Sequence, residues 1–191
     1  MTEPARAQPV LLGVTVGLLS LAADAATKAW ALSALHDGHQ ITVPGGVLRL
    51  QLVLNHGAAF GLGAGLEPLI AAAGFAGVVL FGLWARHASG RLERIGAALA
   101  AGGAAGNLLD RLIRPPGVLH GAVTDWIHVS FYGPTFNLAD VWLRGGVLVA
   151  AVGWLWAHRT RQHNHAPEPA QLPGEARRRK LAGVTGLIAP P

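Results

Sequence analysis

The sequence predicts an all-α membrane protein, a bundle of four transmembrane helices, from its composition and its apolar runs. Of the 191 residues, 51% are hydrophobic and only 13% are charged, and the mean hydropathy is +0.39. These values are too apolar and too uncharged for an ordinary soluble domain. A span needs about 20 apolar residues, so a chain of this length accommodates roughly four spans and modest loops. We expect no second large domain.

Four apolar runs set the predicted spans, and the basic residues set their orientation. The runs cover residues 10–35, 66–84, 95–113 and 137–156. Arginines follow the second run at residues 86–94 and the fourth run at residues 159–161. The positive-inside rule therefore predicts that both segments and both termini are cytoplasmic.

The positive-inside rule also explains the excess of basic residues in the chain. The net charge of +5 and the pI near 11.0 come from arginines beside the spans and in the tail, so no nucleic-acid partner is predicted. We expect a four-helix membrane domain at residues 1–162. Residues 163–191 mix Pro, Glu, Arg and Ala and are predicted to form a disordered basic cytoplasmic tail that touches anionic lipid.

The third run ends in the sequence AGGAAGNLLDRL, residues 101–112. Gly102 and Gly106 form a small-xxx-small pair, which favours close helix packing in membranes. Asn107, Asp110 and Arg111 then place polar groups at membrane depth, where such groups usually face a bundle interior and pair or do chemistry. The alternative, an interfacial anchor, explains these residues equally well.

The first run contains an internal pair of opposite charges. Asp24 and Lys28 lie four residues apart and therefore on one helix face, which predicts an ion pair. Ala29 and Ala31 also offer a small-x-small cleavage site of a signal peptide. The leader carries only Arg6 against Glu3, which is a poor signal, so we favour an uncleaved anchor.

Two polar segments, residues 36–65 and 118–134, are too rich in Gly and polar residues to span. Within the first, residues 47–54 alternate with Leu48, Leu50, Leu52 and Leu54 on one face, which predicts a half-buried strand. His56 follows as a loop histidine rather than a metal ligand, because no second ligand lies at a suitable spacing. The chain has no cysteine. No metal or cofactor is predicted.

Four of the ten acidic residues fall at polar span ends on the predicted extracytoplasmic side: Asp24, Asp110, Asp125 and Asp140. Two carboxylates brought together there can share a proton, activate water and protonate a carbonyl. For Asp140 the alternative is structural, because Asn137 can cap the fourth helix and leave Asp140 at the third helical position. For Asp125 the alternative is an exposed loop residue.

The chain resembles the bacterial lipoprotein signal peptidases (signal peptidase II) through five blocks in family order: Asp24–Lys28 as DAATK, Asn55–Gly61 as NHGAAFG, Gly106–Arg111 as GNLLDR, Val123–Ile127 as VTDWI and Phe136–Asp140 as FNLAD. The resemblance implies an aspartic endopeptidase with four transmembrane helices and a small extracytoplasmic β-rich cradle. Such an enzyme cleaves prolipoproteins just before a lipid-modified cysteine in the bacterial inner membrane.

The resemblance also implies roles for individual residues. The catalytic dyad falls on Asp125 and Asp140. The residues implied to position the substrate or support the fold are Asp24, Lys28, Asn55, Asn107, Asp110, Arg111 and Asn137. The expected partners are lipid-modified prolipoproteins and membrane lipids, and the enzyme is expected to act as a monomer.

Two other classes of protein account for part of the sequence. A small proton-coupled transporter also concentrates acidic residues and an arginine in a bundle, but it usually shows repeats or broken helices. A non-catalytic scaffold explains the Gly and Ala packing but leaves the five blocks unexplained. A presenilin-type protease needs a Gly-x-Gly-Asp block, which the sequence lacks.

Overall fold

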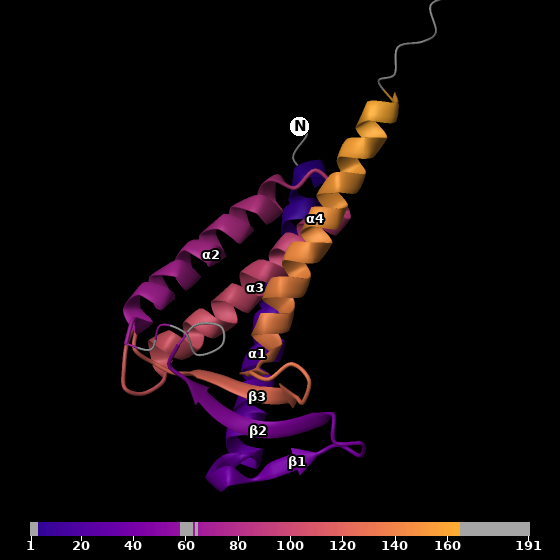
Figure 1. Cartoon of the computed structure of the whole chain (residues 1–191). Coiled ribbons are helices and arrows are strands. Elements are labelled where there is room, and N and C mark those ends of the chain that lie inside the picture. The colour runs from indigo at the N-terminus through magenta and orange to yellow at the C-terminus, as the bar shows by residue number, and fades with distance from the viewer. Residues whose placement is uncertain (1–3, 58–62, 64, 165–191) are drawn as a thin grey trace, which may run out of the picture. The chain divides into compact units, whose positions relative to one another are not determined.

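A computed structural model describes residues 4–57, 63 and 65–164, with side chains for residues 9–57, 63 and 65–160 (Figure 1). Residues Met1–Ala157 form one structural unit and His158–Pro191 another. The predicted tail, residues 163–191, lies almost wholly outside the described residues. The described chain forms four α-helices: α1 Pro4–Ala34, α2 Glu67–His87, α3 Arg91–Ile113 and α4 Leu138–Asn164.

Three of these helices have the length and hydropathy of membrane spans. The apolar ranges are Pro9–Ala34, Glu67–His87 and Leu138–Thr160, among the described residues. α3 does not meet the same criterion, because glycines fill its middle and charged residues lie near both of its ends. The prediction of a mostly helical membrane protein is confirmed, whereas the count of four spans stays a prediction.

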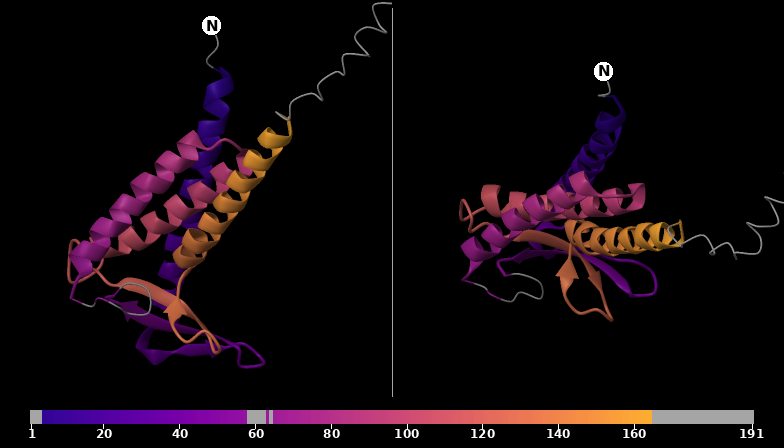
Figure 2. Two further views of the ribbon diagram at one scale, coloured as in Figure 1. Left: turned by 45° about the horizontal axis from the view of Figure 1, so that its top comes forward. Right: turned by 90° about the horizontal axis from the view of Figure 1, so that it is seen from above.

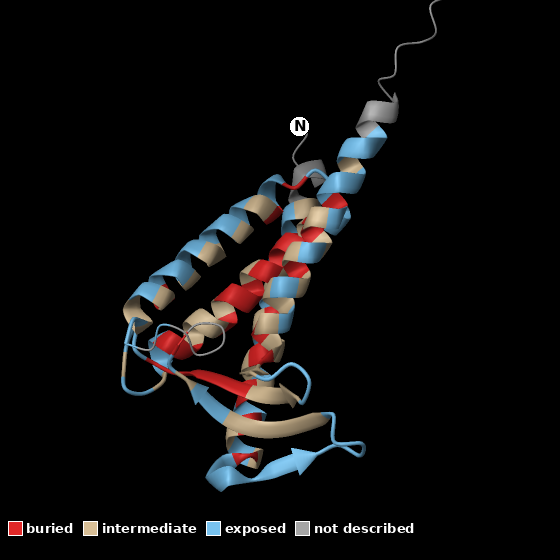
Figure 3. Ribbon diagram, in the orientation of Figure 1, coloured by how far each residue is buried: buried red, intermediate tan, exposed pale blue. Residues whose placement is uncertain are grey.

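α3 is the most buried helix of the bundle (Figure 3). Its glycines allow two neighbouring backbones to approach: a Cβ on Gly102 would collide with Ser20 and Gly17 of α1, and a Cβ on Gly96 would collide with the backbone of α4 at Ala150. A Cβ on Gly106 would meet the Asp24 carboxylate. The close packing predicted for the small-residue stretch is therefore confirmed.

A four-stranded antiparallel sheet in the order β1-β2-β3-β4 lies across the end of the bundle where α1 ends and α4 begins (Figures 1 and 2). Its strands are β1 Gln40–Thr42, β2 Leu48–Asn55, β3 Val123–Val129 and β4 Thr135–Phe136. A single 3₁₀ turn, η1 His36–Gly38, joins α1 to β1. The predicted strand at residues 47–54 is confirmed as β2.

The predicted alternation of burial along that strand is wrong: residues 48–52 are all half-buried, and Leu54 is 52% exposed. The pairing of β2 with β3 shifts register between Leu50 and Val53. An irregularity of this kind turns the following side chains relative to the ladder. Leu54 therefore does not continue the face begun by Leu48 and Leu50, while Asn55 is left opposite Val123, beside the site.

Candidate active site

The end of the bundle under the sheet contains a buried cluster of opposite charges. Lys28 Nζ lies 2.8 Å from Asp24 Oδ2 and 3.0 Å from Asp110 Oδ2, with 1% of the lysine side chain exposed. Arg114 Nε lies 2.6 Å from Asp110 Oδ1. We call these four residues the ion-pair cluster. The predicted Asp24–Lys28 pair is confirmed, and two acids are balanced by two bases, as burial requires.

The ion-pair cluster also holds the two elements that carry the other aspartates. Asp24 Oδ1 accepts a hydrogen bond from the backbone N–H of Ala139 at the start of α4, at 2.8 Å. Asp110 Oδ2 accepts one from the backbone N–H of Thr124 in β3, at 3.0 Å. Each carboxylate thus fixes a backbone position one residue before Asp140 or Asp125.

Asn137 caps α4, as the sequence predicts. Its Oδ1 accepts a hydrogen bond from the backbone N–H of Asp140 at 3.0 Å, and Asp140 Oδ2 accepts one from the backbone N–H of Asn137 at 3.3 Å. This reciprocal arrangement is a capping box. It places the Asp140 carboxylate at the third helical position, where the positive end of the helix favours a negative charge.

Asp125 lies in β3 and is only 2% exposed, so the alternative of an exposed loop residue is wrong. Its Oδ2 accepts a hydrogen bond from Asn55 Nδ2 at 3.0 Å, and its Oδ1 accepts one from Asn137 Nδ2 at 2.7 Å. Burial raises the pKa of Asp125 to about 6; the neighbouring Asp140 carboxylate adds to the rise, and the two amide hydrogen bonds oppose it.

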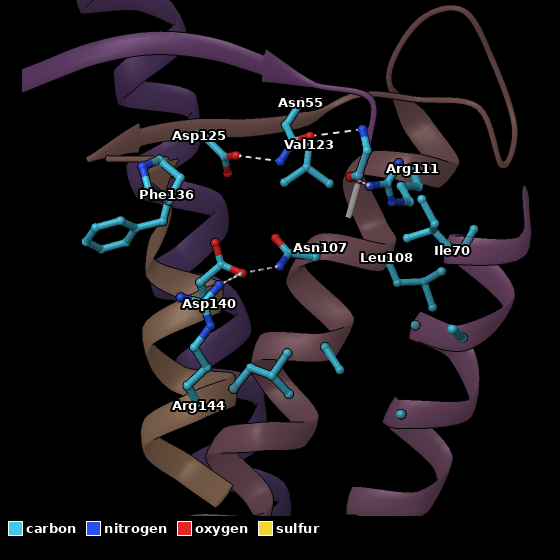
Figure 4. A pocket seen from close by; sticks show the side chains of 18 of the residues that line it. Asn55, Ile70, Asn107, Leu108, Arg111, Val123, Asp125, Phe136, Asp140 and Arg144 are labelled. Atoms are coloured by element: carbon cyan, nitrogen blue, oxygen red, sulfur yellow. Dashed lines mark hydrogen bonds and ion pairs between the residues drawn. The ribbon is translucent and has the colours of Figure 1, made fainter. Parts of the chain in front are cut away.

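Side-chain amides join Asp125 to Asp140. Figure 4 shows one of these bonds, from Asn107 to Asp140. Asn137 donates from Nδ2 to Asp125 and also to Asn107 Oδ1, at 3.0 Å. Asn107 in turn donates from its own Nδ2 to Asp140 Oδ1, at 3.2 Å. We call Asp125 and Asp140 the amide-bound pair. Lys28 donates to the same Asn107 Oδ1 at 3.0 Å, which fixes the orientation of that amide.

Arg111 binds backbone carbonyls rather than a carboxylate. Its guanidinium donates to Gly57 O at 2.5 Å, to Gly121 O at 3.4 Å and to His56 O at 3.5 Å. It therefore ties the segment that follows β2 and the segment that precedes β3 to α3. Residues 58–61 of the NHGAAFG block lie outside the described residues.

A pocket of about 720 Å³ opens beside the amide-bound pair. Both aspartates line it, together with Asn55, Asn107 and Arg111 at its polar end (Figure 4). Most of the rest of its wall is apolar and comes from α2, α3, α4 and the β3–β4 hairpin: Ile70, Phe81, Leu108, Phe136, Leu143 and Val147 are examples. Within the described ranges, no three His, Asp or Glu side chains are grouped so as to hold a metal ion.

All nine predicted site residues meet at this end of the bundle, but sequence reasoning missed several of their partners. Arg114 joins the ion-pair cluster, and Thr124 supplies a backbone donor. Tyr132 and Arg144 line the pocket. The four-residue spacings from Asp110 to Arg114 and from Asp140 to Arg144 could have predicted these two pairs, because residues four apart share a helix face.

A model of the family described as signal peptidase (SPase) II matches residues 16–156. This chain belongs to the signal peptidase II family. It is a family of proteases, and the resemblance carried by the five blocks is thereby confirmed.

Relatives of the family have similar sequences over most of their length. The lipoprotein signal peptidase of Rhodococcus jostii is 35% identical over 153 residues, which cover 78% of this chain and 75% of the relative. That of Bifidobacterium adolescentis is 40% identical over 129 residues, 67% of each chain. That of Mycobacterium tuberculosis is 35% identical over 152 residues, covering 78% and 72%.

Two solved structures of bacterial membrane enzymes share the fold. One has a TM-score of 0.65 at 20% identity and covers 84% of this chain and 93% of its own. The other has a TM-score of 0.62 at 24% identity, covering 75% and 92%. The arrangement of helices and sheet is therefore that of known membrane enzymes.

Proposed function

We propose that this signal peptidase II family member is an aspartic endopeptidase that removes signal peptides from prolipoproteins, cutting before a lipid-modified cysteine. The observation that supports it best is the amide-bound pair: two carboxylates from different elements, both lining one pocket and joined through Asn137. Membership of the family supports the substrate class.

The chemistry follows from two carboxyl groups that share one proton. The ionised carboxylate takes a proton from water as the water oxygen attacks the scissile carbonyl carbon, and the protonated carboxyl gives its proton to the carbonyl oxygen. When the tetrahedral intermediate collapses, the C–N bond breaks and the leaving nitrogen takes the first proton from the carboxyl that received it. As the C=O bond re-forms, a hydroxyl of the intermediate returns a proton to the second carboxylate. Hydrolysis is complete with both carboxyl groups back in their starting forms.

The pocket suits a substrate that is half lipid and half peptide. Its apolar wall between α2, α3 and α4 offers a place for apolar substrate groups, which are stabilised there by removal from water. The amides of Asn55 and Asn107 at the polar end can bond to the substrate backbone, which otherwise loses hydrogen bonds when it leaves water.

We further propose that all four helices cross the bacterial inner membrane, with both termini cytoplasmic and the sheet outside. α3 crosses in spite of its low hydropathy because α1, α2 and α4 bury most of its surface. Residues 1–162 then form the peptidase domain, which we expect to act as a monomer in contact with membrane lipid.

The topology is tested with single cysteines at His39 and Ser89, which are both exposed. An impermeant thiol reagent is expected to label the first from outside intact cells and the second only after the membrane is opened. Labelling of both from one side would contradict the four-span arrangement.

The function is tested by incubating the purified protein with a diacylglyceryl-modified prolipoprotein and following release of the signal peptide. The same precursor without its lipid is the matched control, and we expect it to be cut far more slowly. Chelators and thiol reagents are expected to leave cleavage intact. Loss of activity with a chelator and recovery with zinc would move the protein to the metallopeptidases. No cleavage of the lipidated precursor would refute the proposed function.

A further inference from the structure

Arg144 lies one helical turn after Asp140 on α4 and outside the five sequence blocks. Its Nη2 is 3.9 Å from Asp140 Oδ1, with 46% of the arginine side chain and 19% of the aspartate side chain exposed. The same aspartate oxygen accepts the hydrogen bond of Asn107. In Figure 4 the guanidinium reaches back along the helix to the Asp140 carboxylate.

The other side of the guanidinium is held by the β3–β4 hairpin. Arg144 Nη1 donates to the Tyr132 hydroxyl at 2.8 Å. The Tyr132 ring packs edge to face on Phe136, with centroids 5.6 Å apart, and both rings line the pocket. Arg144 is therefore anchored between a helix and a hairpin, which lowers the entropy lost in holding it beside Asp140.

Charged and titratable groups surround the amide-bound pair: Asp24 and Lys28 on α1, Glu67 on α2, Asp110 and Arg111 on α3, Arg114 directly after α3, Tyr132 in the hairpin and Arg144 on α4. The other cations are engaged elsewhere. Lys28 and Arg114 pair with the acids of the ion-pair cluster, and Arg111 binds carbonyls. Among the described residues, Arg144 is the one cation within 4.0 Å of either member of the pair.

The two members of the pair thus differ in what stabilises a negative charge. Asp140 has a cation and the positive end of α4. Asp125 lies in a strand, is almost fully buried and has only amide donors, so a charge on it is more costly.

We propose that Arg144 is a positioning residue that keeps Asp140 ionised, so that Asp140 takes the proton from water while Asp125 holds the shared proton and gives it to the carbonyl oxygen. The inference rests on the aspartic mechanism proposed above and assigns the two roles within it. The guanidinium does not touch the reacting atoms. It acts through the charge of the carboxylate.

The test is the pH profile of kcat/KM for a lipidated prolipoprotein, whose acid limb reports the base of the free enzyme. Without the cation, Asp140 takes up a proton more readily. Arg144→Met is therefore expected to move the acid limb to higher pH by about half to one unit, the size expected of one half-exposed charge at this distance. Arg144→Lys keeps the charge and is expected to leave the limb near its wild-type position.

A matched control makes the same change at Arg86, an exposed residue in the last turn of α2. Arg86→Met is expected to leave the limb unmoved. A second measurement needs no variant: raising the salt concentration screens a half-exposed pair, so the acid limb of the wild type is expected to move upward, while that of Arg144→Met stays in place.

Three results would overturn the inference. They are an Arg144→Met profile that superimposes on the wild type, an Arg144→Lys limb displaced as far as that of Arg144→Met, and a wild-type limb insensitive to salt. Each is measured on an enzyme that cleaves. An inactive wild type would instead refute the function itself, so the two failures are distinguishable.

Discussion

The ion-pair cluster and the amide-bound pair lie side by side at the sheet end of the bundle, but they differ in how near cations lie to their carboxylates. In the cluster every carboxylate has a cation within 3.0 Å. In the pair the direct hydrogen bonds come from Asn side chains and one backbone N–H, and the single cation is half-exposed and 3.9 Å away. Both regions contain two aspartates.

This difference distinguishes aspartates that support the fold from aspartates that can take part in proton transfer. A carboxylate paired with cations at short distance can hold backbone hydrogen-bond donors in place, which suits Asp24 and Asp110 as supports of α4 and β3. A carboxylate short of cations in a buried site can hold a proton near neutral pH, which general acid–base chemistry requires. The first region therefore positions the second.

The largest expected effect comes from removing the acid–base groups of the amide-bound pair. Asp125→Asn and Asp140→Asn are each expected to lower kcat for lipidated precursor by at least about 10³-fold, because an amide can neither ionise nor carry the proton. The double variant is expected to be hardly worse than either single one, since members of one catalytic unit fail together. Signal-peptide release measures this.

Asp24→Asn and Asp110→Asn are the comparison for that experiment. They are expected to lower the yield of folded protein and to leave measurable turnover. If either of them abolished turnover while a variant of the amide-bound pair stayed near normal, the assignment of the pair would be wrong.

The next effect concerns stability and the ion-pair cluster. Lys28→Met leaves two buried carboxylates without their shared cation and is expected to destabilise the protein by about 3–5 kcal/mol, the usual cost of breaking a buried ion pair. Thermal unfolding in detergent measures it. Adding Asp24→Asn to Lys28→Met removes one of the unbalanced charges and is expected to recover part of the loss. A double variant less stable than Lys28→Met alone would show that charge balance is not what the lysine supplies.

The smallest expected effect is a gain in folding stability rather than a loss. Because burial raises the pKa of Asp125 to about 6, the native state holds this proton more tightly than the unfolded chain. The stability that results is present at low pH and is lost as pH rises through about 6. Asp125→Asn removes the titration, so it is expected to stabilise the protein relative to wild type at pH 8, by up to about 3 kcal/mol.

That gain should shrink at pH 5, where the wild-type carboxyl is largely protonated. Tm measured at the two pH values gives the comparison, with Asp110→Asn as the control that should lose stability at pH 8. An Asp125→Asn protein no more stable than the wild type at pH 8 would mean that the charge on Asp125 is well tolerated in the folded state.

The helices and their charged ends were predictable from the sequence because they depend on local patterns. Hydropathy located all four helices, the four-residue spacing of Asp24 and Lys28 predicted their pair, and Asn137 was readable as a cap. Each of these interactions forms within a few residues of chain.

The sheet and the surroundings of the aspartates were less predictable because they depend on contacts between distant segments. β1 and β4 have three and two residues, too few for a period-two pattern. β3 carries the alternation of Val123, Asp125 and Ile127, but its burial follows from pairing with β2 and from the bond between Asp110 and Thr124. Likewise, the Arg144 spacing was visible, whereas its contact with Tyr132 required the hairpin.

The glycine faces of α3 have a consequence for the order in which the protein is made. One face packs against α1, which is synthesised earlier, but the face at Gly96 and Gly103 packs against α4. While the 27 residues of α4 are still being translated, that face is bare backbone, and α3 has too little hydropathy to be held firmly by lipid alone. We therefore expect α3 to be held stably in the membrane only after α4 has been synthesised and has packed against it.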